Sequence, residues 1–456
     1  MQKTIPPEVK HILKTLASNG FKACIAGGAV RDMLLGCPAE DFDIVTTASN
    51  KDIQAIFKDK TIKTVGNTFH ICLVNAVEVA SCRSTESNTS FPETDLGKRD
   101  FTINSMAWDP LSQTIIDPFS GRTDLAEKII RFTQDPDTRI SEDPLRMIRA
   151  CRFAAKINGS LDPEACHAIQ KNKALVPQKT AFERIRMEIL KAMVCKTPSV
   201  FFRYLRRTGL LAYILPSLDR CFDLDGGPHH GETVFDHCLL TGDALSPKRP
   251  LLRLAGFLHD IGKYDAAEIK DGQLTFPGHE KKRQAVIEDL QRLKFSIKEI
   301  TYIDALISVH MRPLKEDTTP KAVRKILARL EQKDLTYQDF LRMRIADKKA
   351  NLNPSKRPYT LSDIRTRVKK FRNELFNHSG NGAVLRIKDL AVTGKDIMDI
   401  LDIPQGPRVG EVMAHLFEKV LEAPELNQPA QLRQLALSFS RQRTRNEKTS
   451  HSPEEG

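Results

Sequence analysis

A short stretch between residues 26 and 48 combines two glycines, a basic residue and two aspartates at spacings that suit chemistry on phosphates. Asp41 and Asp43 are two residues apart, and on a strand such residues point to the same side. Like charges so close repel one another unless a cation lies between them, and Mg²⁺ prefers carboxylates together with substrate phosphates. The pair therefore predicts a catalytic Mg²⁺ site of the kind used in phosphoryl and nucleotidyl transfer.

The residues before this pair predict a binding site for phosphates. Gly27 and Gly28 follow an apolar run and precede a predicted helix, and free backbone N–H groups at a helix start bind anions. Arg31 is expected in the first turn of that helix, where its charge opposes the helix dipole unless an anion compensates it. A plain strand-to-helix turn has the same pattern, so the interpretation depends on the aspartates that follow.

A second group of polar residues lies in the middle of the chain. Imidazoles and carboxylates together suit a transition metal, and an adjacent His-Asp pair on a helix can direct both side chains to one ion. A single histidine on an apolar face is usually an ordinary core residue, whereas an ordered series predicts a metal site. The series, in helical contexts, is His237, His259, Asp260, His279, His310 and Asp347.

The elements that must position these residues change in type near residue 140. Before it, the runs FKACIAGG, FDIVTT, TFHICLV and AVEVASC have the character of strands. After it, EDPLRMIRACRFAAKI and AFERIRMEILKAMV place apolar residues three and four apart, as amphipathic helices do. The predicted fold class is α+β, with a small mixed α/β head followed by all-helical domains.

The charged residues, apolar runs and cysteines of the chain indicate which partners the protein binds and where it is located. Lys and Arg outnumber Asp and Glu by 70 to 58, which favours a polyanionic partner such as nucleic acid, although basic surfaces also occur without one. No run approaches the roughly 18 apolar residues of a membrane-spanning helix, and the first ten residues lack the apolar stretch of a secretory signal. The nine cysteines include no Cys-x-x-Cys pair, so we expect reduced thiols and a cytoplasmic protein without membrane contacts.

Six motifs in order, over about residues 20–215, closely resemble those of class II tRNA nucleotidyltransferases and bacterial poly(A) polymerases. They are AGGAVRDMLLG with the following DFD, VEVASCR, KRDFTINSMAWD, DPFSGRTDLAEKIIR, EDPLRMIRACRFAAK and AFERIRMEIL. The resemblance implies a transferase that adds CCA or CC to the tRNA 3′ end from CTP and ATP, without a nucleic-acid template. It assigns catalysis to Asp41 and Asp43 with Mg²⁺, and nucleotide binding to Gly27, Gly28, Arg31, Arg99, Asp100, Asn104, Asp143, Arg146 and Arg149.

Within this resemblance, Asp143 and Arg146 are expected to read the incoming base. They are three residues apart, hence on one helix face, and they offer acceptors and donors that match the Watson–Crick edge of C or A. Arg149, one turn later, is expected to reach the triphosphate. An exposed Asp-Arg pair on an amphipathic helix has the same spacing.

Three departures from the family pattern bear on the product. Lys98 replaces the first Arg of the sugar-binding block and lacks the planar fork. The loop between Arg83 and Arg99 is short, as in CC-adding relatives, and VGNTFHICLV lacks the paired basic residues expected of poly(A) polymerases. We therefore expect CCA addition, with CC addition left open.

The central His and Asp series resembles the HD superfamily of metal phosphohydrolases, whose two middle histidines are typical of sites for two metals. This resemblance implies a transition metal and metal-assisted hydrolysis of a phosphoester. The Gly-Pro-x-x-Gly sequence at residues 406–410 resembles the body and tail of bacterial tRNA nucleotidyltransferases. The predicted domains are a nucleotidyltransferase head at 1–138, a base-recognising neck at 139–220, an HD domain at 221–352, an RNA-binding body and tail at 353–440 and a disordered tail at 441–456.

Two alternatives stay open at this point. A poly(A) polymerase shares the head and neck, and incorporation of C into a truncated tRNA would exclude it. The chain could also be primarily an HD phosphohydrolase whose head only binds nucleotide or RNA. Asn substitution of Asp41 and Asp43 distinguishes this alternative from the transferase: if the head only binds, all measured activity stays intact in the variant.

Overall fold

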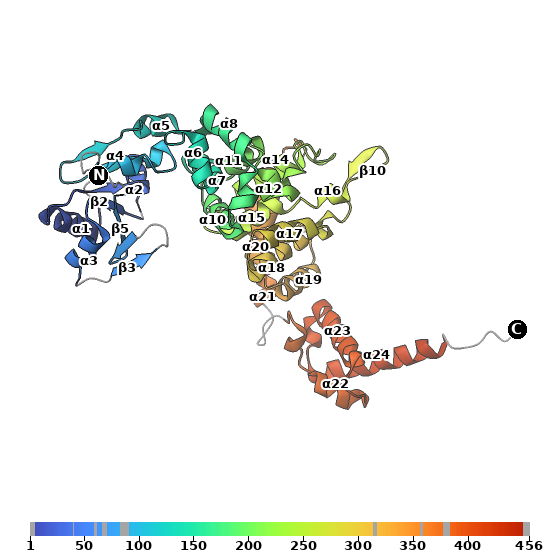
Figure 1. Ribbon diagram of the computed structural model, residues 1–456. Helices are drawn as coiled ribbons and strands as arrows, with labels where there is room; N and C mark the ends of the chain where they lie inside the picture. Colours follow the sequence, from blue (N-terminus) through green and yellow to red (C-terminus); the bar gives the residue numbers. More distant parts are fainter. Residues whose placement is uncertain are drawn as a thin grey trace. The chain divides into compact units, whose positions relative to one another are not determined.

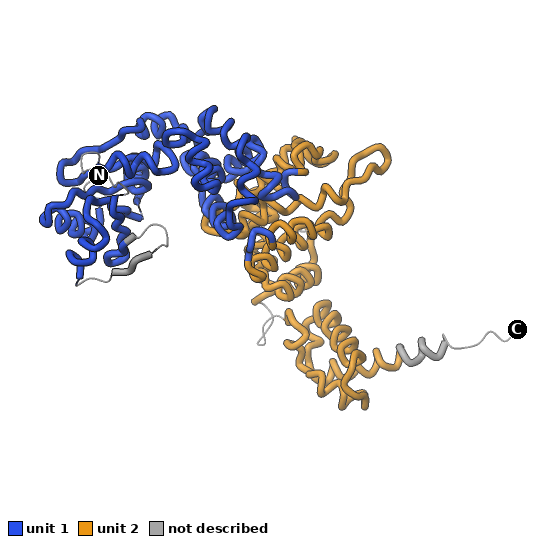
Figure 2. The backbone as a smooth tube through the Cα atoms, viewed as in Figure 1, with its two compact units in different colours: residues 1–219, 292–295 blue, residues 220–291, 296–456 orange. Residues whose placement is uncertain are grey.

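The computed structural model describes residues 5–39, 41–58, 62–65, 71–82, 91–312, 317–355, 359–376 and 384–449. The chain divides into two compact units, residues 1–219 with 292–295 and residues 220–291 with 296–456 (Figure 2). Residues 66–70 and 83–90 lie outside the described part, so the predictions drawn from the short loop and from VGNTFHICLV stay predictions.

A seven-stranded mixed sheet opens the first unit (Figure 1). Strands β2 and β5 pair in parallel, and the other neighbouring strands pair antiparallel. The fold class expected for the head is therefore confirmed. In sheet order the strands are β3 (Ile62–Val65), β4 (Ile71–Val74), β5 (Val77–Ser81), β2 (Asp43–Thr46), β1 (Ala23–Ala26), β6 (Ala107–Asp109) and β7 (Thr114–Ile116).

Short helices and a small second sheet complete the head. The first helix buries Val9, Ile12, Leu13 and Leu16, spaced three and four apart as on one helix face. These elements are α1 (Pro7–Ser18), α2 (Gly28–Leu34), α3 (Asn50–Ile56), α4 (Glu93–Leu96), α5 (Gly121–Glu127), β8 (Ile129–Ile130) and β9 (Ser160–Leu161).

The rest of the first unit is helical, and one predicted helix is interrupted. Residues 142–157 were expected to be continuous, but Pro144 disfavours helical backbone at Asp143, which is extended with φ −152° and ψ 99°. The prediction that Asp143 and Arg146 share a helix face is therefore wrong. The helices are α6 (Pro136–Glu142), α7 (Leu145–Ile157), α8 (Pro163–Asn172), α9 (Leu175–Lys179), α10 (Phe182–Met193), α11 (Ser199–Arg207), α12 (Leu211–Ile214) and α13 (Pro216–Asp219).

The second unit is helical apart from one hairpin, β10 (Glu268–Lys270) with β11 (Gln273–Thr275). Its helices up to residue 376 are α14 (Val234–Ala244), α15 (Pro250–Leu258), α16 (Lys263–Ala266), α17 (Gln284–Arg292), α18 (Ile297–Val309), α19 (Pro320–Gln332), α20 (Tyr337–Ala350) and α21 (Leu361–Phe376). Within the described residues, no helix has both the length and the apolar character needed to cross a membrane.

Three further helices end the chain and share a core with part of α19. They are α22 (Gly394–Leu401), α23 (Pro407–Glu422) and α24 (Pro429–Thr449), and they pack around residues such as Ile397, Leu416 and Leu432. Helix α24 continues past residue 441, where the sequence led us to expect disorder. Its last turns consist largely of Arg, Gln, Glu and Lys, which have good intrinsic helix propensity.

Candidate functional site

The sheet brings together three carboxylates, two expected and one not. Asp43 is the first residue of β2 and lies opposite Ala26 on one neighbouring strand and Glu78 on the other. Phe42 is buried, whereas Asp41 is exposed. Asp41, Asp43 and Glu78 line one cavity of about 1070 Å³. The two aspartates thus border one space, as the two-residue spacing predicts.

The carboxylates in this space repel one another, and a cation between them would relieve the repulsion. Burial raises the pKa of the half-buried Asp43 carboxyl, the Arg99 guanidinium opposes the shift, and the negative charge of Asp41 adds to it. A donor set made of carboxylate oxygens fits Mg²⁺, which takes carboxylates and phosphates as ligands. Glu78 was missed from the sequence, although a single acidic residue in the apolar run VEVAS soon after the aspartates was a usable signal.

The glycine turn differs in one respect from the prediction. Gly27 has φ +81°, which residues with a Cβ rarely adopt, and an added Cβ would also overlap the Arg99 guanidinium. Its N–H donates to Met106 O at 2.9 Å, since pairing of β1 with β6 continues one residue beyond the strand. Gly27 therefore offers no free N–H group, and the expectation of one is wrong. Helix α2 begins at Gly28, which lines the 1070 Å³ cavity.

Arg31 is buried beside this cavity, and the carboxylate of Asp32 compensates its charge. Its Nε donates to Asp32 Oδ1 at 2.9 Å, and its Nη1 donates to Asn104 Oδ1. The guanidinium also lies 4.9 Å from the centre of the Phe153 ring, a cation–π distance. Arg31 and Asn104 both line the cavity, as do Arg99 and Arg149.

A second cavity of about 280 Å³ shares Asp43, Glu78, Arg99 and Arg149 with the first. Asp43 and Glu78 therefore border both spaces, whereas Asp41 lines only the larger one. The predicted nucleotide-binding residues that line this cavity are Arg99, Asp100, Asp143, Arg146 and Arg149, and Lys98 lies among them.

Asp100 links the sugar-binding block to the neck. It is buried and accepts hydrogen bonds from Phe101 N at 2.9 Å, Asn104 Nδ2 at 2.9 Å and Arg149 Nε at 2.8 Å. Burial alone would raise the pKa of Asp100, but the charge of Arg149 and these hydrogen bonds hold it below its usual range. In this arrangement Asp100 fixes the position of Arg149 at the cavity wall.

The two residues expected to read the base are each held by other partners. Asp143 is bound by both Nη atoms of Arg184, at 3.1 and 2.7 Å. Arg146 donates to Glu142 Oε2 at 2.6 Å and to Lys98 O at 3.2 Å. Arg184 was missed because it lies on α10, far from Asp143 in sequence.

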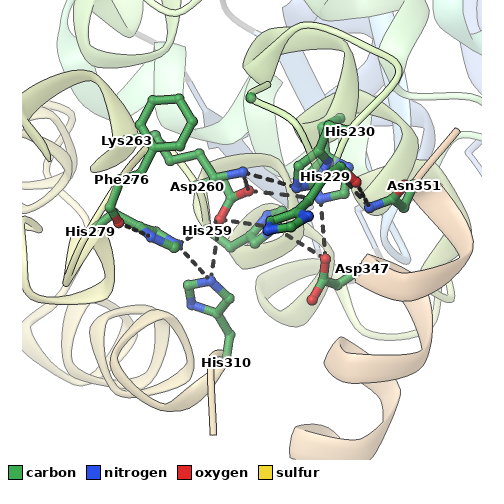
Figure 3. Close-up of polar contacts among 12 residues, drawn as sticks. His229, His230, His259, Asp260, Lys263, Phe276, His279, His310, Asp347 and Asn351 are labelled. Carbon is green, nitrogen blue, oxygen red and sulfur yellow. Dashed lines mark hydrogen bonds and ion pairs between the residues drawn. The ribbon is translucent and has the colours of Figure 1, made fainter. Parts of the chain in front are cut away.

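All six residues of the predicted metal series meet in the second unit (Figure 3). Asp260 Oδ1 lies 3.2 Å from both His279 Nε2 and His310 Nε2, and 3.4 Å from His259 Nε2. Asp347 Oδ1 lies 3.1 Å from His237 Nε2 and 3.9 Å from His259 Nε2. His259 and Asp260 directly follow the last residue of α15, so the expected adjacent pair turns inward at a helix end.

The orientation of the imidazole rings in the cluster fits metal ligands. His259, His279 and His310 place Nδ1 against backbone carbonyls, and His237 places it against Glu232, which leaves every Nε2 facing the centre. Burial lowers the pKa of His259 to about 3, so its ring is neutral, and its buried Nε2 has no hydrogen-bond partner among the residues that the structure describes. A mixed imidazole and carboxylate set suits a transition metal.

Three more polar residues border this cluster and were not predicted. They are His230, Glu232 and Lys263, with Lys263 Nζ 2.7 Å from Asp260 Oδ2 and 3.2 Å from His230 Nε2. The sequence offered two signals for them, the glycine-flanked GGPHHGET and the lysine that follows His-Asp in HDIGK. Two histidines of the cluster differ in pKa. Burial, together with the charge of His310, lowers the pKa of His259. For His237 burial acts in the same direction, but hydrogen bonds to Asp347 and Glu232 outweigh it and raise the pKa to about 9.

Comparison with known proteins agrees with this fold. The family described as Poly A polymerase head domain matches residues 23–131, and the probable RNA and SrmB-binding site of polymerase A matches residues 160–222. A crystal structure of the Bacillus stearothermophilus CCA-adding enzyme in complex with CTP superposes with a TM-score of 0.72 at 24% identity. The superposition covers 97% of this chain and 100% of that one, which establishes a shared fold.

Two curated relatives match most of the chain. The multifunctional CCA protein of Actinobacillus pleuropneumoniae is 31% identical over 376 residues, 75% of this chain and 88% of the relative. The A-adding tRNA nucleotidyltransferase of Deinococcus radiodurans is 28% identical over 411 residues, 87% of this chain and 91% of the relative. Other matches, to curated CCA-adding enzymes at 35 and 37% identity, span only 57 and 56% of those enzymes.

A mixed sheet that carries carboxylates beside an arginine-lined cavity, joined to a helical neck, defines a nucleotidyltransferase head. The chain belongs to the family of tRNA nucleotidyltransferases and poly(A) polymerases.

Proposed function

We propose that this protein adds nucleotides to the 3′ end of tRNA, using CTP and ATP, in the cytoplasm. The observation that carries the proposal is that Asp43 and Glu78 border both cavities of the head. Residues assigned to the nucleotide line both cavities. Asp100, Asp143 and Arg146 line only the smaller one, whereas Gly28, Arg31 and Asn104 line only the larger one. A carboxylate pair between two spaces suits a reaction between a bound nucleotide and a chain end.

Asp41, Asp43 and Glu78 are the residues that would hold Mg²⁺. When bound, the ion supplies activation of the attacking 3′ hydroxyl and stabilisation of the departing pyrophosphate. Arg99 and Arg149 place positive charge at the wall shared by both cavities, where a triphosphate would need it. Asp100 keeps Arg149 in that position through its ion pair.

Base selection falls to Asp143 and Arg146 in this proposal. Both line the 280 Å³ cavity, and together they offer acceptors and donors for the edge of C or A. Each now makes other polar contacts, so we expect nucleotide binding to exchange some of them. Protein side chains would then take the place of a template.

The test is extension of a tRNA that lacks its terminal CCA, with Mg²⁺ and CTP, ATP or both, followed by sizing of the product. Addition of C, C and A supports the full reaction. Addition of A alone to a tRNA that already ends in CC points to the activity named for the Deinococcus relative, and long A tracts without C point to a poly(A) polymerase. No product with any nucleotide would refute the proposal.

A second activity, hydrolysis of phosphoesters by the HD cluster, is favoured by the inward-facing Nε2 atoms of four histidines. His237, His259 and Asp347 form one group of donors, and His259, Asp260 and His310 form another. Asp260 also faces His237 and His279, so Asp260 would be shared between two metal ions. Bound metal supplies a water nucleophile at neutral pH. The test is hydrolysis of bis(p-nitrophenyl) phosphate with Mn²⁺, Co²⁺ or Ni²⁺, and an Asp260→Ala variant that hydrolyses as fast as the natural protein would refute it.

A further inference from the structure

The four histidines of the HD cluster are held in place by two kinds of support. His259, His279 and His310 each face the carbonyl three residues earlier through Nδ1, at 2.9, 3.0 and 2.6 Å. Those carbonyls belong to the main chain and are fixed by the fold. The Nδ1 of His237 lies instead 2.8 Å from Oε1 of Glu232. The orientation of this ring therefore depends on one side chain.

Glu232 is surrounded by groups that donate to it. Its Oε1 also lies 2.9 Å from His230 Nδ1, and its Oε2 accepts from Gly231 N and Leu352 N, each at 2.9 Å. Its side chain is 3% exposed. A buried carboxylate with both oxygens occupied in this way can act only as an acceptor toward His237.

We propose that Glu232 is a positioning residue of the HD metal centre, which holds the proton of His237 on Nδ1 and so presents Nε2 to a divalent cation. The inference rests on the metal site proposed above. Carboxylates in this role orient a histidine ligand and typically change metal affinity by about 10- to 100-fold.

The same contacts give both ring nitrogens of His230 partners of their own. Its Nδ1 faces Glu232, and its Nε2 lies 3.2 Å from Lys263 Nζ, which is a donor. Lys263 in turn lies 2.7 Å from Asp260 Oδ2. Polar contacts thus run in a ring through five residues: Asp260, Lys263, His230, Glu232 and His237. Through this ring the loop before α14 contacts both Asp260 and His237.

Glu232→Gln is the informative variant because it keeps the shape and changes the donors. Glutamine has one acceptor oxygen and one NH₂ group. If the NH₂ group faces Gly231 N and Leu352 N, which are donors themselves, the two hydrogen bonds that Glu232 accepts from them are lost. If it faces His237 Nδ1, that atom must become the acceptor, and the proton moves to Nε2, where it competes with the cation.

Three comparisons make the test specific. The Thr233→Ala variant removes the N-cap hydroxyl of α14, which accepts from Asp236 N at 3.1 Å, and leaves Glu232 intact. Glu232→Asp keeps a carboxylate on a shorter side chain. A double-mutant cycle with His237→Ala tests whether Glu232 acts through His237. If it does, Glu232→Gln has no further effect on metal binding in the His237→Ala background.

The measurement is titration of the full-length protein and its variants with Co²⁺, followed by visible absorption, with Asp260→Ala as the baseline and circular dichroism as the check of folding. We expect Glu232→Gln to weaken Co²⁺ binding about 10- to 100-fold, Glu232→Asp to recover part of it, and Thr233→Ala to bind like the natural protein.

The outcomes separate two failures. If the natural protein binds Co²⁺ no better than Asp260→Ala, the proposed metal site is refuted, and the role of Glu232 with it. If the natural protein binds and Glu232→Gln binds equally well, only the role of Glu232 is refuted. An undiminished effect of Glu232→Gln in the His237→Ala background refutes it as well, because Glu232 would not then act through His237.

Discussion

Replacing Gly27 with alanine is expected to damage the head through its backbone and through Arg99. Gly27 has φ +81° and ψ −131°, a conformation that residues with a Cβ rarely adopt. Forcing such a backbone on alanine costs about 1–3 kcal/mol of folding free energy. We therefore expect the free energy of unfolding to fall by that amount.

The second effect is on the site. A Cβ on Gly27 would lie 3.3 Å from Cζ of Arg99 and would overlap its Nη1. The guanidinium is the flexible end of a side chain, so it can move aside at small steric cost. A displacement of about 1 Å in a positioned group lowers catalysis roughly 100-fold. The expected result is a loss of that size in kcat/KM for CTP incorporation.

Gly28→Ala is the matched control for stability. An added Cβ there meets Arg31 Nη2 at 3.5 Å and Arg31 Nη1 at 4.0 Å, which are ordinary contacts, and φ is not in the left-handed region. Alanine also favours helix over glycine. Urea denaturation should therefore show Gly28→Ala as stable as the natural protein or more so, and Gly27→Ala clearly less stable. Equal stabilities of the two variants would refute the argument.

Two further predictions concern the nucleotide cavity. Asp100→Asn should cost about 3 kcal/mol at neutral pH because it leaves Arg149 without its buried partner, and urea denaturation measures this. The pKa of Asp100 is lowered on folding, so the stability that its charge contributes is present above the ordinary pKa of about 4 and is lost as the pH falls below it. A difference in unfolding free energy between Asp100→Asn and the natural protein that stays constant down to strongly acid pH would contradict this role of Asp100. Arg184→Gln removes a half-exposed ion pair and should change stability by less than ~1 kcal/mol. It should nevertheless raise incorporation of UTP and GTP, because Asp143 is then less firmly oriented, and unchanged discrimination in a nucleotide-competition assay would sink this role for Arg184.

A local rule led to the carboxylate pair, whereas the metal series was predicted from an ordered set of residues and a family resemblance. Asp41 and Asp43 border one cavity, but β2 begins only at Asp43, so the alternation of side chains along a strand does not by itself account for the position of Asp41. The six His and Asp residues lie close together through long-range contacts, which the family resemblance implied and no local rule contains. The fold class is confirmed, and the roles of individual site residues stay predictions.

The features that the sequence did not reveal depend on contacts between distant segments. Glu78 joins the aspartates only through the parallel register of β2 and β5. Arg184 reaches Asp143 from another helix, and Glu232 reaches Leu352 N across a large sequence separation. The interruption at Pro144 was different, because the residue before a proline rarely continues a helix, and that local rule was available.

The central claim, that Asp41, Asp43 and Glu78 serve one metal-dependent transfer reaction, is tested most directly with labelled CTP and a tRNA lacking its CCA end. The natural protein should extend this tRNA in the presence of Mg²⁺, and Asp43→Asn should abolish extension while circular dichroism shows the same folding. Extension by Asp43→Asn at the natural rate would contradict the account.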